Sequence, residues 1–121
     1  MGERNATADR IKEIAAFLDL DEVLRFARSR KTAERVGAAV ALGVHIRSSK
    51  QTRADRRVLS ALGELLTDRR SSLVRYRAAE VLQSSPALVA TYEDDLEELA
   101  ARDANSYVRD MAATALRRHR R

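Results

Sequence analysis

Cysteine and tryptophan are absent from this chain of 121 residues, and proline and glycine occur only one and four times. Without cysteine there is neither a disulfide framework nor a thiolate metal site, which fits a reducing compartment. So few Pro and Gly residues argue against a turn-rich β protein. Aromatic residues make up 4% of a chain that is 45% hydrophobic. Ala, Val and Leu must therefore build the core, which favours thin layers of helices.

Long apolar runs are also missing. No stretch approaches the roughly 18 residues that a membrane-spanning helix needs, and residues 1–20 lack the apolar segment of a signal peptide. We therefore expect no membrane contact and a cytoplasmic location.

The charge is +5, and all but three of the 23 basic residues are Arg. The cationic excess is spread along the chain, which favours a generally solvated surface over a dedicated basic face. Binding of nucleic acid through its phosphate backbone stays open as an alternative.

A nine-residue pattern occurs three times. Residues 74–82 read VRYRAAEVL, residues 108–116 read VRDMAATAL, and residues 34–42 read ERVGAAVAL as a worn copy. Arg, the Ala-Ala pair and Leu stay in register, and the copies are 40 and 34 residues apart. Repetition at a period of roughly 20 to 50 residues is typical of stacked repeat proteins.

The pattern has a physical reason on a helix. At about 100° per residue, Val74, Ala78, Val81 and Leu82 form one apolar stripe. Ala79 lies beside the stripe, where a side chain larger than methyl would push a neighbouring helix away. Small Ala pairs flanked by Val and Leu suit close stacking of helices.

These residues resemble the HEAT repeat, in particular the short bacterial HEAT-like repeats that are also found in phycobilin lyases. The resemblance covers residues 21–118 and places the motif on the second helix of each helix pair. It implies an all-α fold, a right-handed α-solenoid of about three HEAT-like helix pairs (six to seven helices). Residues 1–20 would form an N-terminal capping helix and residues 21–121 the HEAT-like repeat domain.

Capping residues divide the chain into helices. We expect helices over residues 7–18 (capped by Thr7) and 21–28, with one kinked helix over 7–28 as the alternative. Further helices should follow Thr32, Thr52, a Ser at 71 or 72, and Ser106, with a loop over residues 47–53. Ser85 followed by Pro86 starts another, either as one helix over 86–101 or as a short turn before a main helix over 92–102.

The second helix of the first pair is apolar all round. Val36, Val40 and Gly43 stand where the later copies carry polar residues. A helix of this kind is usually buried. The N-terminal helix is the expected cover, and a partner protein is the alternative.

The HEAT resemblance implies that each motif Arg pairs with an Asp in the turn just before it. Asp68 precedes Arg75 by seven residues and Asp103 precedes Arg109 by six. Arg35 has no Asp at either spacing, so its pairing is in doubt.

We expect structural roles for two other charged groups. The alternatives are an acidic docking patch at 93–98 and, at 117–121, a basic extension that contacts nucleic acid or an acidic partner. The acidic run at 93–98 lies at a helix start, where the helix dipole favours carboxylates, and the basic residues at 117–121 complete the last helix. His45 and His119 are isolated, so we expect no metal and no cofactor. No catalytic triad or glycine-rich phosphate loop occurs, and we expect no enzyme activity.

The function predicted from the sequence is non-catalytic protein–protein interaction, with the chain as a scaffold module whose second helices bind another protein. A monomer is favoured over an end-to-end dimer through Tyr107 and Met111. The residues expected at the partner surface are Tyr76, Arg77, Glu80, Gln83, Asp110, Thr114 and Arg117.

Overall fold

The computed structural model describes residues 19–120, which form seven α-helices, one 3-10 helix and no strand. The expected all-α class is therefore confirmed for this part of the chain. The expected helix over residues 7–18 lies outside the described residues. The elements are α2 (Leu20–Ala27), α3 (Thr32–Ser48), α4 (Lys50–Ala54), α5 (Arg56–Leu66), α6 (Ser72–Ser84), η1 (Pro86–Tyr92), α7 (Glu93–Arg102) and α8 (Ser106–His119).

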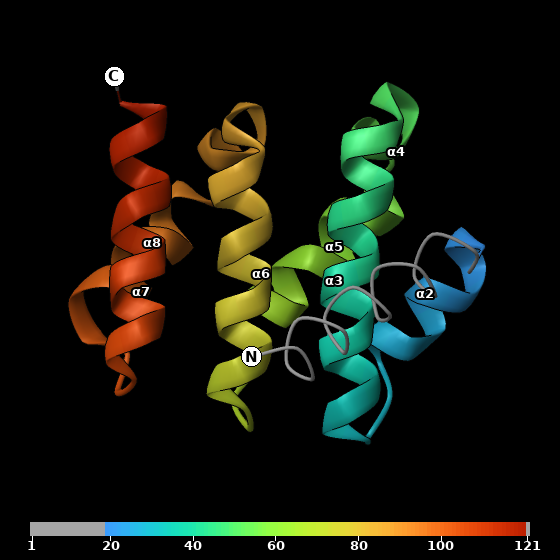
Figure 1. Cartoon of the computed structure of the whole chain (residues 1–121), viewed down its shortest axis with the longest axis horizontal. Coiled ribbons are helices and arrows are strands. Elements are labelled where there is room, and N and C mark those ends of the chain that lie inside the picture. Colours follow the sequence, from blue (N-terminus) through green and yellow to red (C-terminus); the bar gives the residue numbers. More distant parts are fainter. Residues whose placement is uncertain (1–18, 121) are drawn as a thin grey trace, which may run out of the picture.

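The three copies of the motif lie on α3, α6 and α8. These helices run side by side in the same direction, with α6 in the middle (Figure 1). Each of α2, α5 and α7 packs against the motif helix that follows it in the chain. The result is a layer of motif helices backed by a layer of shorter helices.

The core lies between these layers and is built by the motif. Val74, Ala78, Val81 and Leu82 are all buried, as the helical spacing predicts. The equivalent positions on α8 are buried as well. Leu62, Leu65 and Leu66 of α5 fill the space behind α6. Small side chains let the motif helices approach closely, which maximises contact between them.

Gly43 lies where α3 packs on α6. A Cβ atom added to it would come within 3.0 Å of the Val81 Cγ2 atom. Part of this helix is therefore covered by α6, whereas the N-terminal helix that was expected to cover it lies outside the described residues. Val36 and Val40 are half-buried rather than fully enclosed, and Val36 packs against the core.

The segment between α3 and α5 differs from the sequence prediction. The expected loop over residues 47–53 is largely helical, since α3 continues to Ser48 and α4 follows. Thr52 does not cap α5. Ser49 accepts the backbone N–H of Thr52 and caps α4, whereas Asp55 accepts the backbone N–H of Arg57 and caps α5. The polar composition of this segment does not exclude a helix, because short surface helices need no apolar stripe.

Two other predicted caps are wrong by one residue. Thr32 is the first residue of α3, and the cap position before it, Lys31, makes no side-chain capping bond. Asn105 caps α8 instead of Ser106, since its side-chain oxygen accepts the N–H groups of Tyr107 and Val108. An amide side chain can serve as well as a hydroxyl at this position.

The remaining start signals are confirmed. Asp19 caps α2 by accepting the N–H of Glu22, so α2 begins as a helix of its own. Ser71 caps α6. Between α6 and α8 the second alternative holds, because the 3-10 helix η1 starts at Pro86 and precedes the main helix α7. Tyr92 ends η1 in the core, where its hydroxyl donates to the Leu59 carbonyl at 2.6 Å.

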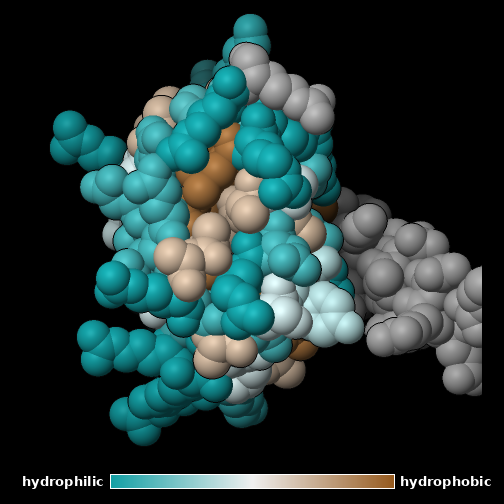
Figure 2. Space-filling model, turned by 90° about the vertical axis from the view of Figure 1, so that its left-hand side faces the viewer, coloured by the Kyte–Doolittle hydropathy of each residue, from teal (hydrophilic) through white to brown (hydrophobic). Residues whose placement is uncertain are grey.

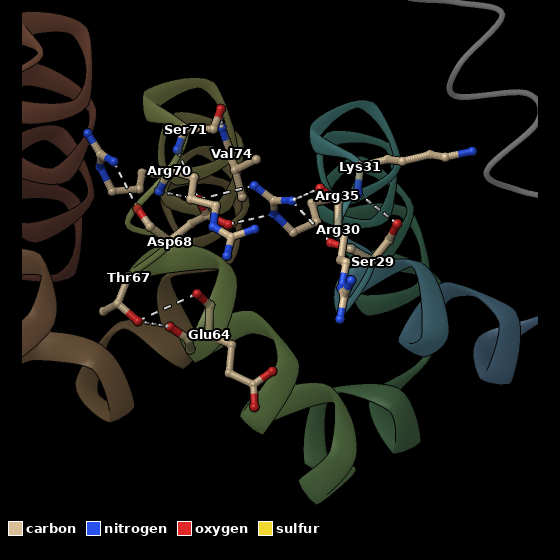
Figure 3. Close-up of polar contacts among 12 residues, drawn as sticks. Ser29, Arg30, Lys31, Arg35, Glu64, Thr67, Asp68, Arg70, Ser71 and Val74 are labelled. Atoms are coloured by element: carbon tan, nitrogen blue, oxygen red, sulfur yellow. Dashed lines mark hydrogen bonds and ion pairs between the residues drawn. The ribbon is translucent and has the colours of Figure 1, made fainter.

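Buried ion pairs link α3 and α6 to the turn before the next motif helix. Arg35 Nε donates to Asp68 Oδ2 at 2.7 Å, and the two side chains are 8% and 10% exposed. Figure 3 shows Arg35 reaching from α3 to Asp68 in the turn that precedes α6. Arg75 Nε donates to Asp103 Oδ2 at the same distance. We call these two pairs the arginine ladder.

The ladder corrects the predicted pairing. The HEAT resemblance assigns each Asp to the motif Arg of its own repeat, but each Asp binds the Arg of the preceding one. Arg35, whose pairing was in doubt, forms a buried pair with Asp68. The motif Arg holds its own turn through backbone carbonyls instead, as Arg75 Nη1 does with Asp68 O at 2.8 Å and Arg109 Nη1 with Asp103 O at 2.6 Å.

Both ladder carboxylates are ionised more readily than usual. Burial alone would raise the pKa of Asp68, but the hydrogen bond from Arg35 and the N–H groups of Arg70 and Ser71 outweigh it and lower the pKa. Burial likewise opposes ionisation of Asp103, and Arg75 with the Asn105 N–H lowers its pKa.

Candidate protein-binding surface

The predicted site residues lie on the outward sides of α6 and α8. Their spacing of three or four residues places the members of each helix on one stripe. Asp110 and Arg117 are exposed, whereas the other five are half-buried. Gln83 is thus less accessible than the sequence suggested.

On α6, three of these residues form one group. Arg77 Nη1 lies 3.1 Å from Glu80 Oε1, and its guanidinium carbon lies 5.8 Å from the centre of the Tyr76 ring. This distance falls within the range of a cation–π contact. The Nε atom of Arg77 is buried and has no hydrogen-bond partner among the described residues. Arg77 is therefore held against the protein by a carboxylate and a ring.

On α8, the predicted residues are connected locally. The Thr114 hydroxyl donates to the Asp110 carbonyl at 2.8 Å and accepts from Arg117 Nη2 at 3.0 Å. These bonds satisfy the polar groups within the helix. They give this side of α8 a polar character.

The sequence prediction missed the most exposed apolar residue of α6. Leu73 is 48% exposed and Tyr107 of α8 is 73% exposed. Among the described residues these are the two large hydrophobic side chains that are exposed. Both line one shallow hollow of about 250 Å³ between the N-terminal ends of α6 and α8. Its lining consists of Ser72, Leu73, Tyr76, Asn105 and Tyr107, and we call it the Leu73–Tyr107 surface.

A signal for this surface exists in the sequence. Leu73 and Tyr107 each stand immediately before the motif Val in the two good copies. Residues at the same position of neighbouring parallel helices lie at the same level, which is how these two come to line one hollow. Tyr107 and Met111 were the residues considered for an end-to-end dimer. Tyr107 is exposed, whereas Met111 is half-buried and packs against the core.

The seven predicted residues do not form a single patch. Tyr76 joins the Leu73–Tyr107 surface, whereas Arg117 lines a second hollow on the other side of α8, where α7 and α8 meet. The predicted residues therefore belong to two regions. One is apolar and lies at the start of α6 and α8, and the other is basic and lies near the end of α8.

Comparisons with protein-family models, with curated proteins and with solved structures find no match. In residues 19–120, no helix is long and apolar enough to cross a membrane. The same residues contain no group of three or more His, Asp or Glu side chains that is placed to hold a metal ion.

Proposed function

We propose that the chain is a non-catalytic protein-binding scaffold that holds another protein on its Leu73–Tyr107 surface. The observation that carries this proposal is the pairing of Leu73 and Tyr107 around one hollow. Single exposed apolar residues are ordinary on protein surfaces. Leu73 and Tyr107 are two large apolar side chains on adjacent helices, and the half-buried ring of Tyr76 lies beside them. Together they form an apolar patch of the kind in which binding energy is concentrated.

The architecture that we propose is a HEAT-like α-solenoid. Support comes from the three motif copies in register, from the packing of α3 on α6 and α6 on α8, and from the arginine ladder, which joins consecutive copies. In such an array each repeat contacts only its neighbours, which leaves an extended face for binding.

Binding of nucleic acid is the second candidate, and the contacts favour it less. Arg77 lies on the outward side of α6, but its charge is paired with Glu80. A phosphate would have to compete with this carboxylate. A protein partner that presents an apolar side chain needs no such exchange.

The test is a capture experiment with matched variants. The wild-type chain, Leu73→Asp with Tyr107→Asp, and a control with Ser60→Asp and Ala101→Asp are used to capture partners from the native host. The control adds the same charge at exposed positions of α5 and α7. We expect one protein to be retained by the wild type and the control and lost by the first variant, and purified components should reproduce this pattern.

Gel-shift titrations at two salt concentrations test the alternative function, binding of nucleic acid. A phosphate binder that makes several contacts loses affinity steeply as salt rises. Tight, salt-dependent binding that survives Leu73→Asp with Tyr107→Asp but falls with Arg117→Gln would contradict the proposal.

A further inference from the structure

The surface of α7 and α8 that is turned away from α6 forms a second hollow. Figure 2 shows apolar surface in the middle of this side, surrounded by hydrophilic side chains. The hollow has a volume of about 490 Å³, and its floor is formed by Ala100, Ala113 and Leu116. Arg117 and Arg120 line its rim. We call this region, together with Arg109, the end face.

The end face repeats a surface that is covered elsewhere in the molecule. Ala39 on α3 and Ala79 on α6 occupy the same motif position as Ala113 on α8. Both are completely buried because another motif helix packs against α3 and against α6. No described element packs on α8 in this way, and Ala113 is only half-buried.

The motif arginines show what is missing from the end face. In Arg35 and Arg75, Nη1 donates to a carbonyl of the preceding turn while Nε and Nη2 donate to the Asp of the next turn. Arg109 Nη1 makes the same kind of bond, to Asp103 O. Within residues 19–120, no carboxylate lies at ion-pair distance from Arg109.

We propose that the end face binds a helix pair of a partner protein, with an aspartate in the turn between its two helices. Its carboxylate accepts hydrogen bonds from Nε and Nη2 of Arg109, as Asp68 does on Arg35. Its second helix covers Ala113 and Leu116. A planar guanidinium already held by its own turn is well suited to such a bidentate bond. This inference does not depend on the Leu73–Tyr107 surface, which lies elsewhere.

A second copy of the chain is a poor occupant of this face. In its first turn Ser29 stands at the place of the ladder Asp, and Arg28, Arg30 and Lys31 surround it. These cations would meet Arg109 and the other arginines of the end face. Like charges across an interface suppress association. Arg120 is bound to Glu93 and Glu97, so it is partly neutralised. Arg109 forms no such ion pair within residues 19–120, and only the charge of nearby Asp103 acts on it.

The test uses the full chain as target and a displayed library of helical hairpins as probe. Every hairpin has the length of α7, its turn and α8. The position equivalent to Asp103 and the helix positions that would face α8 are randomised. We expect the selected hairpins to carry Asp or Glu at the turn position. Their affinity should fall about tenfold or more for Arg109→Gln, because one charged hydrogen-bonded pair is lost.

Two further targets distinguish binding at the end face from binding elsewhere on the chain. Ala113→Arg does not change the arginine ladder but fills the floor of the hollow in the end face, so it should also abolish binding of the hairpins. Leu73→Asp with Tyr107→Asp changes a different surface and should leave that binding unchanged. Selection without preference for an acidic turn, or equal binding to Arg109→Gln, would overturn the proposal. A wild-type dimer in sedimentation equilibrium that Ala113→Arg dissolves would also overturn it, because the occupant would then be a second copy.

Discussion

Breaking the arginine ladder should cost far more stability than breaking a surface ion pair. Arg35 and Asp68 are both about nine-tenths buried. Removing one partner of such a pair leaves a buried charge uncompensated, which typically costs about 3–5 kcal/mol. Asp68→Asn is the most selective substitution, because it changes the ion pair and keeps the size of the side chain. Its oxygen can still accept the backbone N–H groups of Arg70 and Ser71, while its amide N–H₂ would face the Arg35 donors.

The matched control is Glu98→Gln on α7. Glu98 lies 3.6 Å from Arg102 in an i,i+4 pair whose side chains are 65% and 77% exposed. Pairs of this kind contribute about 0.3–0.5 kcal/mol. The two substitutions have the same chemistry, so the difference between them reports burial and geometry. A domain with about 5–15 kcal/mol of stability should stay folded enough for both to be measured.

Urea unfolding followed by circular dichroism gives the free energies. A double-mutant cycle with Arg35→Met and Asp68→Asn should yield a coupling energy of about 2 kcal/mol. Added salt should change the coupling little, because buried pairs are poorly screened. A coupling energy below about 0.5 kcal/mol, or equal losses for Asp68→Asn and Glu98→Gln, would refute the reasoning that the ladder joins the repeats.

Two further predictions follow from the packing and from the pKa values. Ala78 is fully buried, so Ala78→Leu should lower stability by about 1–3 kcal/mol through overpacking, whereas Arg118→Leu at an exposed position of α8 should change it little in the same thermal melts. The lowered pKa values of Asp68 and Asp103 stabilise the fold above the unfolded pKa of about 3.9. That stability should be lost as pH falls through the lower folded pKa values. Urea midpoints between neutral pH and pH ~3 should therefore fall less steeply in Asp68→Asn, and a parallel fall would contradict the assignment.

The sequence predicted the buried face of each motif helix because that information is local. Val74, Ala78 and Leu82 recur at helical spacing, and each is buried. Ser71 as the cap of α6 was equally readable, since a cap is set by residues within one turn. Helix starts at Asn105 and Asp55 were misplaced because several neighbouring residues can cap, and a small difference in backbone geometry selects one of them.

The ladder could not be predicted correctly from spacing within one repeat. Asp68 lies seven residues from Arg75 and 33 from Arg35, so local distance favours the wrong partner. The partner of Asp68 is set by the stacking of α3 on α6, which brings the Arg35 side chain to the Asp68 turn while Arg75 is turned toward the following repeat.

The Leu73–Tyr107 surface also depends on the packing of successive helices. Each residue alone is an ordinary exposed side chain, and only the parallel alignment of α6 and α8 brings the two into one hollow. Where a repeat protein contacts its neighbours, the informative comparison is therefore between equivalent positions of successive copies. That comparison identifies Arg109 and Ala113 as the places where the next contact should form.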